Sequence, residues 1–289
     1  MTTAEVLEKV RKIEIRTKGL SNTLFSGEYH SAFKGKGMSF SEVREYAPGD
    51  DVRAIDWNVS ARLSTPYVKV FEEEREQTLM LLVDISQSAL IGSTTKSKRD
   101  LITEICAVLA FSAIANNDKV GILFFSHKVE KYIPPSKGKS HVLRLIKELI
   151  TIEPIQSAHT DINTSLDYLN RVMKRRTIAF LISDYVAPTF EKALKISARR
   201  HDFIGIHIYD PLDEYLPEIG LFPLLDIETG EYIWVDTNDK KVRQQFRKKF
   251  LEHQEFCQTI FSKSGADLLT IGTEQDFVKK LNGFFIGRK

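Results

Sequence analysis

The segment Leu79–Leu90 reads LMLLVDISQSAL. Five apolar residues are followed directly by Asp84, and Ser86 and Ser88 stand two and four positions after it. An uninterrupted apolar run is typical of a strand that is covered on both faces. Burying an ionised carboxylate costs several kcal/mol unless another group compensates its charge. The segment therefore predicts a buried strand that ends in a polar site.

The sequence on either side of this segment predicts an α/β fold. Further apolar strands are expected at 119–126, 176–185, 202–210 and 266–272. Helices with apolar faces are expected at 97–116, 140–150, 162–174, 189–200, 239–263 and 274–285. Strands that alternate with helices form βαβ units, so we expect a doubly wound, mostly parallel sheet of the Rossmann-like type.

Two shorter β elements are also predicted. Residues 129–135 favour a short edge strand that Pro134 and Pro135 end, because proline has no N–H to donate to a sheet. Residues 221–236 favour a β-hairpin with its turn at Thr229–Gly230. This hairpin would be inserted into the alternating pattern of strands and helices.

Residues 1–76 differ in texture and are predicted to form an N-terminal extension, while residues 77–289 form the α/β domain. The extension favours a short helix with a capping box at Thr2 and Glu5. Its remaining predicted elements are a loop or hairpin over 26–40, a turn at 46–51 and an exposed strand over 67–74.

Composition and charge exclude several classes of protein. The 41 Lys and Arg residues nearly balance the 39 Asp and Glu residues, whereas nucleic-acid and anionic-membrane binders need a clustered basic excess. The longest apolar run, Ile105–Phe111, is far shorter than the ~20 residues of a membrane span. Cys106 and Cys257 lie in apolar helical patterns, which predicts buried free thiols. We therefore expect a cytoplasmic protein that binds no nucleic acid and inserts in no membrane.

Polar residues follow other predicted strands as well. Ser183 and Asp184 end the third strand, and Thr160 and Asp161 precede a helix. Ligands of such sheets bind at the carboxyl ends of the strands, where these groups and Asp84 would gather. Carboxylates and hydroxyls suit Mg²⁺, with Mn²⁺ as an alternative, and the absence of His and Cys argues against zinc. Asp161 is expected instead to cap its helix.

A subset of these polar residues resembles a known metal site. The spacing D-x-S-x-S…T…D is that of the metal-ion-dependent adhesion site of von Willebrand factor A (vWA) domains, and it is filled here by Asp84, Ser86, Ser88, Thr160 and Asp184. The resemblance covers about residues 77–289 and implies a vWA-like fold. It also implies that the three hydroxyls ligate Mg²⁺ directly, that the aspartates act directly or through water, and that an acidic side chain of a partner protein completes the coordination.

A second motif lies in the extension. Tyr46–Arg62 reads YAPGDDVRAIDWNVSAR, which resembles the signature R-x-Y-x-P-G-D-D-x-R-x-I-D-W…A-R of the DUF58 family. Proteins of that family are commonly encoded beside MoxR-type AAA+ ATPases. The resemblance therefore implies such an ATPase as a partner.

Four residues of this motif, Arg53, Asp56, Trp57 and Arg62, allow two interpretations. They can form an ion-pair cluster, with Trp57 as an apolar anchor, that pins the extension to the α/β domain. Alternatively they form a docking surface for a partner, since the planar guanidinium of Arg is suited to binding anions. We expect pinning, although the sequence alone leaves both interpretations open.

These observations favour a non-enzymatic, Mg²⁺-dependent protein-interaction module, a partner or adaptor of a MoxR-type ATPase in protein maturation or assembly. Two alternatives stay open. One is a metal-dependent phosphohydrolase with Asp84 as the phosphoryl acceptor, although Ser86 stands where such enzymes place a second aspartate. The other is a metal-free scaffold with a vestigial site.

Overall fold

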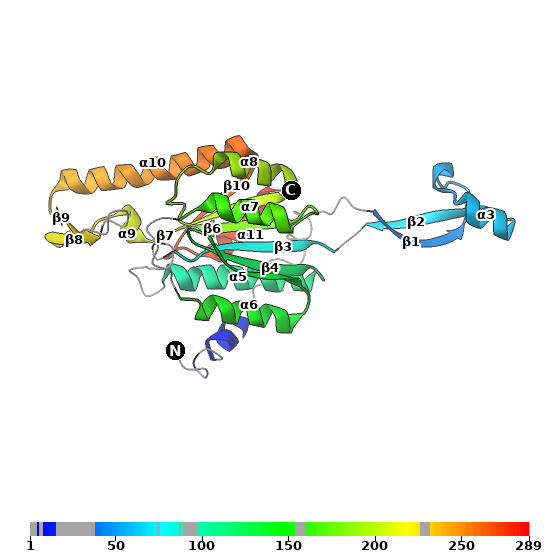
Figure 1. Cartoon of the computed structure of the whole chain (residues 1–289), viewed down its shortest axis with the longest axis horizontal. Helices are drawn as coiled ribbons and strands as arrows, with labels where there is room; N and C mark the ends of the chain where they lie inside the picture. The colour runs from blue at the N-terminus through cyan, green and yellow to red at the C-terminus, as the bar shows by residue number, and fades with distance from the viewer. Residues whose placement is uncertain are drawn as a thin grey trace.

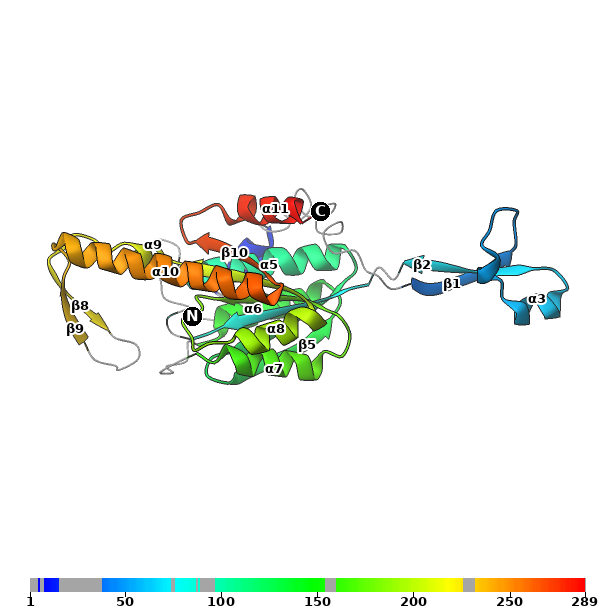
Figure 2. The ribbon, with the colours of Figure 1, turned by 90° about the horizontal axis from the view of Figure 1, so that it is seen from above.

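The structure is a computed structural model that describes residues 5, 8–15, 38–73, 76–86, 88, 97–153, 160–225 and 232–288. The predictions for Thr2, for residues 26–37 and for the Thr229–Gly230 turn lie outside these residues. Figure 1 shows an α/β body from which a narrow arm projects at one end. A shorter projection lies at the opposite end of the body (Figures 1 and 2).

Within the described residues, six strands form the sheet of the body, in the order β10-β7-β6-β3-β4-β5. Their bounds are β3 Thr78–Asp84, β4 Lys119–Phe125, β5 Val129–Ser136, β6 Ile178–Ser183, β7 Asp202–Tyr209 and β10 Asp267–Gly272. Neighbouring strands are parallel except β4 and β5. The predicted doubly wound, mostly parallel sheet is confirmed, and its order reverses at β3, the strand that ends in Asp84.

Helices cover both faces of this sheet (Figures 1 and 2). One face packs against α5 Lys98–Ala115, α6 Lys139–Thr151 and α11 Phe277–Gly287, and the other against α7 Ile162–Val172, α8 Glu191–Arg200 and α10 Lys240–Ser264. Side chains of a strand point alternately to opposite faces. Leu79, Leu81 and Val83 of β3 therefore enter one core, and Met80 and Leu82 enter the other. This explains why β3 is apolar at every position before Asp84.

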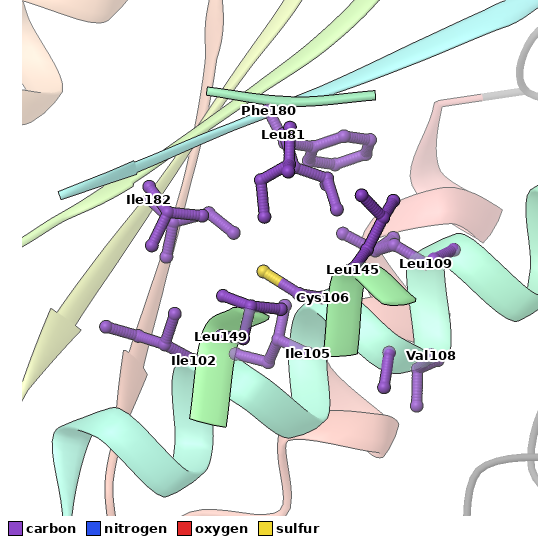
Figure 3. Packing of buried hydrophobic residues seen from close by; sticks show 14 of the residues in the cluster. Leu81, Ile102, Ile105, Cys106, Val108, Leu109, Leu145, Leu149, Phe180 and Ile182 are labelled. Atoms are coloured by element: carbon purple, nitrogen blue, oxygen red, sulfur yellow. The ribbon is translucent and has the colours of Figure 1, made fainter. Parts of the chain in front are cut away.

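The core beneath α5 is shown in Figure 3, where side chains of α5, α6 and the sheet point toward one another. The labelled side chains are Leu81, Ile102, Ile105, Cys106, Val108, Leu109, Leu145, Leu149, Phe180 and Ile182. Cys106 is 1% exposed, and burial raises the pKa of its thiol well above the ordinary value. Cys257 is buried and free in the opposite core, so the prediction of two buried free thiols is confirmed.

The prolines of β5 do not end the strand, contrary to the prediction. Pro134 and Pro135 lie inside β5, which continues to Ser136. The register between β4 and β5 shifts between Val120 and Ile122, beside these prolines. The predicted edge position is confirmed. A proline is tolerated there because an edge strand has one unpaired side and an irregular register spares the missing N–H.

The arm consists of β1 Met38–Glu45, the 3₁₀ helix η1 Val52–Ala54, α3 Trp57–Leu63 and β2 Tyr67–Glu73. β1 and β2 pair antiparallel. The predicted turn lies between β1 and η1, where the Asp50 N–H donates to the Ala47 carbonyl at 3.0 Å. Because β2 precedes β3 in the chain, the arm leaves the body at the amino end of the central strand (Figure 1).

The helix at residues 8–15 belongs to the body rather than to the arm. Its Val10 and Ile13 are buried in the same core as α5 and α6. Lys9 forms an ion pair with Asp100 at 2.6 Å. Residues 1–76 thus contribute one helix to the body and one projecting arm.

The second projection is the predicted hairpin, formed by β8 Leu221–Leu225 and β9 Tyr232–Asp236. The short helix α9 Pro211–Glu214 connects β7 to it, and α10 follows it. It lies at the carboxyl ends of the parallel strands, opposite the arm (Figure 1). Among the described residues, no helix combines the length and the apolar composition that crossing a bilayer requires.

Candidate metal centre

Asp84 ends the central strand and is completely buried, with 0% exposure. Its carboxylate accepts hydrogen bonds from the Ser86 backbone N–H at 2.9 Å and from the Ser183 hydroxyl at 2.7 Å. Ser183 ends β6, the neighbour of β3. Two adjacent strand ends therefore meet at this carboxylate.

The ionised form of Asp84 is unfavourable in these surroundings. Burial, and to a smaller extent the charge of nearby Asp184, raises the pKa of Asp84 from 3.8 to about 7. The hydrogen bonds from Ser183 and Ser86 lower this pKa but do not offset burial. A divalent cation bound beside the two carboxylates would counter both causes, because it supplies positive charge where water is excluded.

Asp184 follows β6 directly and is 5% exposed. The parallel register pairs Val83 with Ile182, so the chain reaches Asp184 just beyond the level of Asp84. The carbonyl of Asp184 accepts a hydrogen bond from Nε2 of His253 at 3.0 Å. His253 lies on α10, so this helix holds the loop that carries Asp184.

Packing holds the turn after Asp184 in an unfavourable conformation. Tyr185 has a φ of 58°, in the left-handed region that bulky residues rarely adopt. Its buried ring stacks on Phe190 at a centroid distance of 5.7 Å, and its hydroxyl donates to the Leu181 carbonyl at 2.7 Å. Strained residues persist only where their surroundings fix them, and they gather at functional sites. Tyr185 therefore fixes the direction of Asp184. In the sequence, its only signal was an aromatic residue directly after a Ser-Asp pair.

The two serines of the motif lie in the segment after β3. Ser86 is 4% exposed, and its hydroxyl oxygen lies 3.3 Å from that of Ser88. Both hydroxyls therefore face one small region directly beyond Asp84.

Thr160 lies on the other side of β3 from Asp184. It is 3% exposed, and its neighbour Asp161 donates its backbone N–H to the carbonyl of Ser126 at 2.9 Å. Ser126 follows β4, whose Phe125 pairs with Asp84. The ends of β4, β3 and β6 thus bring the threonine, the serine segment and Asp184 to one edge of the sheet.

Asp161 caps α7, as predicted. Its Oδ1 accepts the backbone N–H of Asn163 at 3.0 Å, and its Oδ2 accepts the Thr164 hydroxyl at 2.7 Å. These bonds, and not a metal, account for its position at the start of the helix.

A buried lysine that the sequence pattern did not indicate lies beside the serine segment. Lys98 is 4% exposed, and its Nζ lies 2.6 Å from the Asp213 carboxylate and 3.3 Å from the Ser88 carbonyl. It therefore joins the first turn of α5 to α9 and to the segment that carries the serines. Its only sequence signal was a lysine in the first turn of a strongly apolar helix.

The donor set fits a hard cation. Among the residues that the structure describes, no three His, Cys, Asp or Glu side chains gather as a metal-binding group, so a zinc-type centre has no ligands here. The two carboxylates are accompanied by hydroxyls, which are neutral oxygen donors of the kind that suits Mg²⁺ or Mn²⁺. The buried carboxylate of Asp84, with its raised pKa, is the feature that a bound cation would stabilise.

Helix α3, which carries Trp57 and Arg62, lies far from this centre, at the outer end of the arm (Figure 1). Asp56 caps α3 and pairs with Lys69 at 3.4 Å, both within the arm. Trp57 is 69% exposed. The expected pinning of Arg53, Asp56, Trp57 and Arg62 to the α/β domain is therefore wrong, because the arm folds on itself and projects.

Two solved structures are similar to this chain in fold. An aerotolerance-related membrane protein from Bacteroides fragilis superimposes with a TM-score of 0.52 at 18% identity, over 73% of this chain and 99% of that one. The VWA domain of Rpn10 superimposes with a TM-score of 0.41 at 11% identity, over 72% of this chain and 94% of that one. The likeness to the Bacteroides fragilis protein concerns the α/β fold, whose strand order in this chain reverses at the strand that carries Asp84.

Similar sequences occur in several bacteria. The protein Rv1480 of Mycobacterium tuberculosis is 28% identical over 97% of this chain and 89% of its own length. The protein YeaD of Bacillus subtilis is 28% identical over 38% of this chain and 25% of its own length. Residues 42–256, which include both the arm motif and the candidate metal centre, match the family described as "Protein of unknown function DUF58". The chain therefore belongs to the DUF58 family.

Proposed function

We propose that this chain is a protein-interaction module that binds Mg²⁺ through Asp84, Ser86, Ser88, Thr160 and Asp184, and that the bound ion captures an acidic side chain of a partner. The observation that carries this proposal is the fully buried Asp84, whose pKa burial and Asp184 raise to about 7. The hydrogen bonds that Asp84 accepts do not offset its burial, and a cation bound beside it would make its ionised form favourable.

The ligand set explains why a carboxylate would be captured. Three of the five proposed ligands are neutral hydroxyls. Only the two aspartates therefore bring negative charge to the ion. A further carboxylate is then attracted strongly, because charges interact more strongly where water is excluded. When bound, Mg²⁺ would supply this attraction. The five residues would hold the ion with one coordination position open to the partner.

An apolar surface at the same end of the molecule supports a docking role. The β8–β9 hairpin and its flanks expose large apolar side chains, among them Leu221 at 69% and Trp234 at 67%. Figure 1 places the hairpin at the carboxyl ends of the strands, the end that carries Asp84. Exposed apolar groups near a charged site are typical of protein-binding surfaces.

The family suggests the identity of the partner. The DUF58 resemblance implies a MoxR-type AAA+ ATPase, and we propose that such an ATPase supplies the acidic side chain. The chain would then act as its adaptor in the maturation or assembly of other proteins, without catalysing a reaction itself.

Binding to the purified ATPase tests this function. Calorimetric titration of the wild-type chain is expected to show binding in millimolar Mg²⁺ and its loss in EDTA. Asp84→Ala and the double variant Ser86→Ala/Ser88→Ala are expected to abolish the metal-dependent binding.

Asp161→Asn is the matched control, because Asp161 is a carboxylate of the same edge that caps α7. It is expected to change stability by less than about 1 kcal/mol, because asparagine caps helices about as well as aspartate, and to leave Mg²⁺ binding intact. Binding that persists in EDTA at full strength would contradict the proposal. So would Mg²⁺-dependent hydrolysis of phosphate esters that Asp84→Asn abolishes.

A further inference from the structure

The arm ends in an exposed surface that the metal centre does not use. We call Val52, Arg53, Trp57, Arg62 and Leu63 the tip surface. Its apolar members are 59%, 69% and 53% exposed for Val52, Trp57 and Leu63. Large exposed apolar side chains are frequent in interaction sites, and Trp, Tyr and Arg are enriched among the residues that dominate binding energy.

The tip surface is held on a rigid support. The Ser60 hydroxyl donates to the Asp56 carbonyl at 2.7 Å and accepts the Tyr67 N–H at 2.9 Å, which ties α3 to β2. The Asp56 N–H also donates to the Tyr67 carbonyl at 2.8 Å. A surface that is already ordered loses less conformational entropy on binding. The tip surface is therefore preorganised for binding.

The acidic side chains near the tip surface have bonding partners within the arm, whereas its two arginines form no ion pair among the described residues. Its acidic side chains act within the arm: Asp50 pairs with Arg44 at 2.7 Å, Asp51 caps η1, and Asp56 caps α3. Within the described part of the chain, neither Arg53 nor Arg62 forms an ion pair. Among the described residues, both guanidinium groups of the tip surface are exposed and are not paired with a carboxylate of the chain.

The charge of the whole arm distinguishes between kinds of partner. Residues 38–73 contain seven acidic and four basic side chains. A nucleic acid or an anionic membrane would be repelled by this excess of carboxylates. A protein surface can instead match the local pattern, with an apolar pocket for the indole ring and carboxylates at its rim for the two guanidiniums.

We propose that the tip surface is a second docking site, which binds a protein partner by inserting Trp57 into an apolar pocket and pairing Arg53 and Arg62 with carboxylates of that partner. The arm and the metal centre lie at opposite ends of the body (Figure 1). This binding therefore requires no metal, and the chain holds two protein surfaces apart at its two ends.

The first step of the test captures the partner in living cells with the full chain. The photoreactive amino acid p-benzoylphenylalanine replaces Trp57 in one variant and Leu63 in a second, and the crosslinked protein and its crosslinked residues are identified by mass spectrometry. The expected crosslinked site is an apolar surface bordered by Asp or Glu. Crosslinks only to lipid, to nucleic acid or to a second copy of this chain would overturn the proposal, as would no crosslink from either position.

The second step measures affinity for the purified, identified protein by calorimetric titration in EDTA. Trp57→Ala and the double variant Arg53→Glu/Arg62→Glu are each expected to weaken binding at least about tenfold. Lysine substitutions at the bordering carboxylates of the partner are expected to restore binding to the Arg53→Glu/Arg62→Glu variant, since the charges are then exchanged.

The other tryptophan of the chain provides a matched control. Trp234 is 67% exposed and lies on the hairpin at the opposite end. Trp234→Ala is expected to leave this EDTA-resistant binding unchanged. Unchanged affinity of the tip variants, or loss of wild-type binding in EDTA, would overturn the proposal. Neither result would bear on Mg²⁺ binding by Asp84, which is measured separately.

Discussion

The carboxylate of Asp84 is completely buried. Among the bonds described, those that stabilise its ionised form are hydrogen bonds from Ser86 and Ser183. Its raised pKa means that the metal-free folded protein holds a proton there up to about pH 7. The unfolded chain releases that proton near its ordinary pKa of 3.8. Protonation, metal binding and stability are therefore linked at this one residue.

The sign of this linkage gives a pH prediction. Because the folded pKa is raised, the stabilising contribution is fully present below about pH 4 and is lost as pH rises toward 7. In EDTA, the free energy of unfolding of wild type is expected to fall between pH 5 and pH 8 more than that of Asp84→Asn, as measured by urea denaturation. Saturating Mg²⁺ is expected to reverse this fall in wild type only. Equal pH dependence of the two proteins would contradict the prediction.

Gly205 leaves the space that the side chains of Tyr185 and Phe261 occupy. A Cβ at Gly205 would lie 2.4 Å from the Phe261 ring and 2.7 Å from the Tyr185 hydroxyl. Gly205→Ala is therefore expected to lower the free energy of unfolding by about 1–3 kcal/mol, and to weaken Mg²⁺ binding because Tyr185 directs Asp184. Urea denaturation and metal titration check the two effects.

Gly283 in α11 is the control for that substitution, because a Cβ there would meet nothing within 4 Å. Gly283→Ala is expected to raise stability by up to about 1 kcal/mol through helix propensity. A Gly205→Ala variant as stable as Gly283→Ala would show that Tyr185 has room to move.

Among the elements, α9 is attached to the body by the buried Lys98. The ammonium links α5 to Asp213 of α9, and α9 leads into the exposed β8–β9 hairpin. This ion pair acts together with contacts to α10, where Arg243 pairs with Glu218 and Arg247 pairs with Glu214, to position the hairpin.

Lys98→Met keeps the apolar stem and removes the charge. It is expected to cost about 1–2 kcal/mol, less than a fully buried pair, because the Asp213 side chain is 40% exposed and can be hydrated. Hydrogen exchange is expected to rise in α9 and to stay unchanged in α11. Lys119→Met, which removes a pair with Glu76 exposed at 45% and 38%, is the control and is expected to cost less than about 1 kcal/mol. Equal protection of α9 in wild type and Lys98→Met would refute this role.

At the scale of the whole molecule, the arm and the body have separate interiors. Among the side chains of the arm that the structure describes, those of residues 42–70, none belongs to the two cores of the body, and Val68 is buried within the arm itself. The body therefore gains little stability from the arm. This separation is what a molecule with two independent docking ends requires.

Replacing residues 38–73 by a short Gly-Ser linker tests this separation. The body is expected to keep its circular dichroism and its Mg²⁺ affinity, and its melting temperature is expected to change by only a few degrees (about 2–4 °C per kcal/mol for a chain of this size). Small-angle scattering is expected to show a shorter maximum dimension. Loss of cooperative unfolding would show that the arm is part of the body's fold.

Local pattern determined much of this protein in advance. The apolar runs predicted β3, β4, β6, β7 and β10, because a strand covered on both faces must be apolar at successive positions. The order of strands and helices then restricted the sheet to a doubly wound, mostly parallel form. The polar strand ends indicated which edge would hold the candidate site, and Asp161 was recognised as a cap from its place before a helix.

The tertiary structure alone decided the remaining features, because they depend on contacts between residues far apart in the chain. Lys98 meets Asp213, Tyr185 is fixed by Phe190 and by the space that Gly205 leaves, and the prolines of β5 are tolerated because that strand lies at the edge. The local sequence pattern of the arm is the same whether the arm packs against the body or projects from it. Only its own packing, with Asp56 used as a cap and Trp57 left exposed, places it at the far end from Asp84.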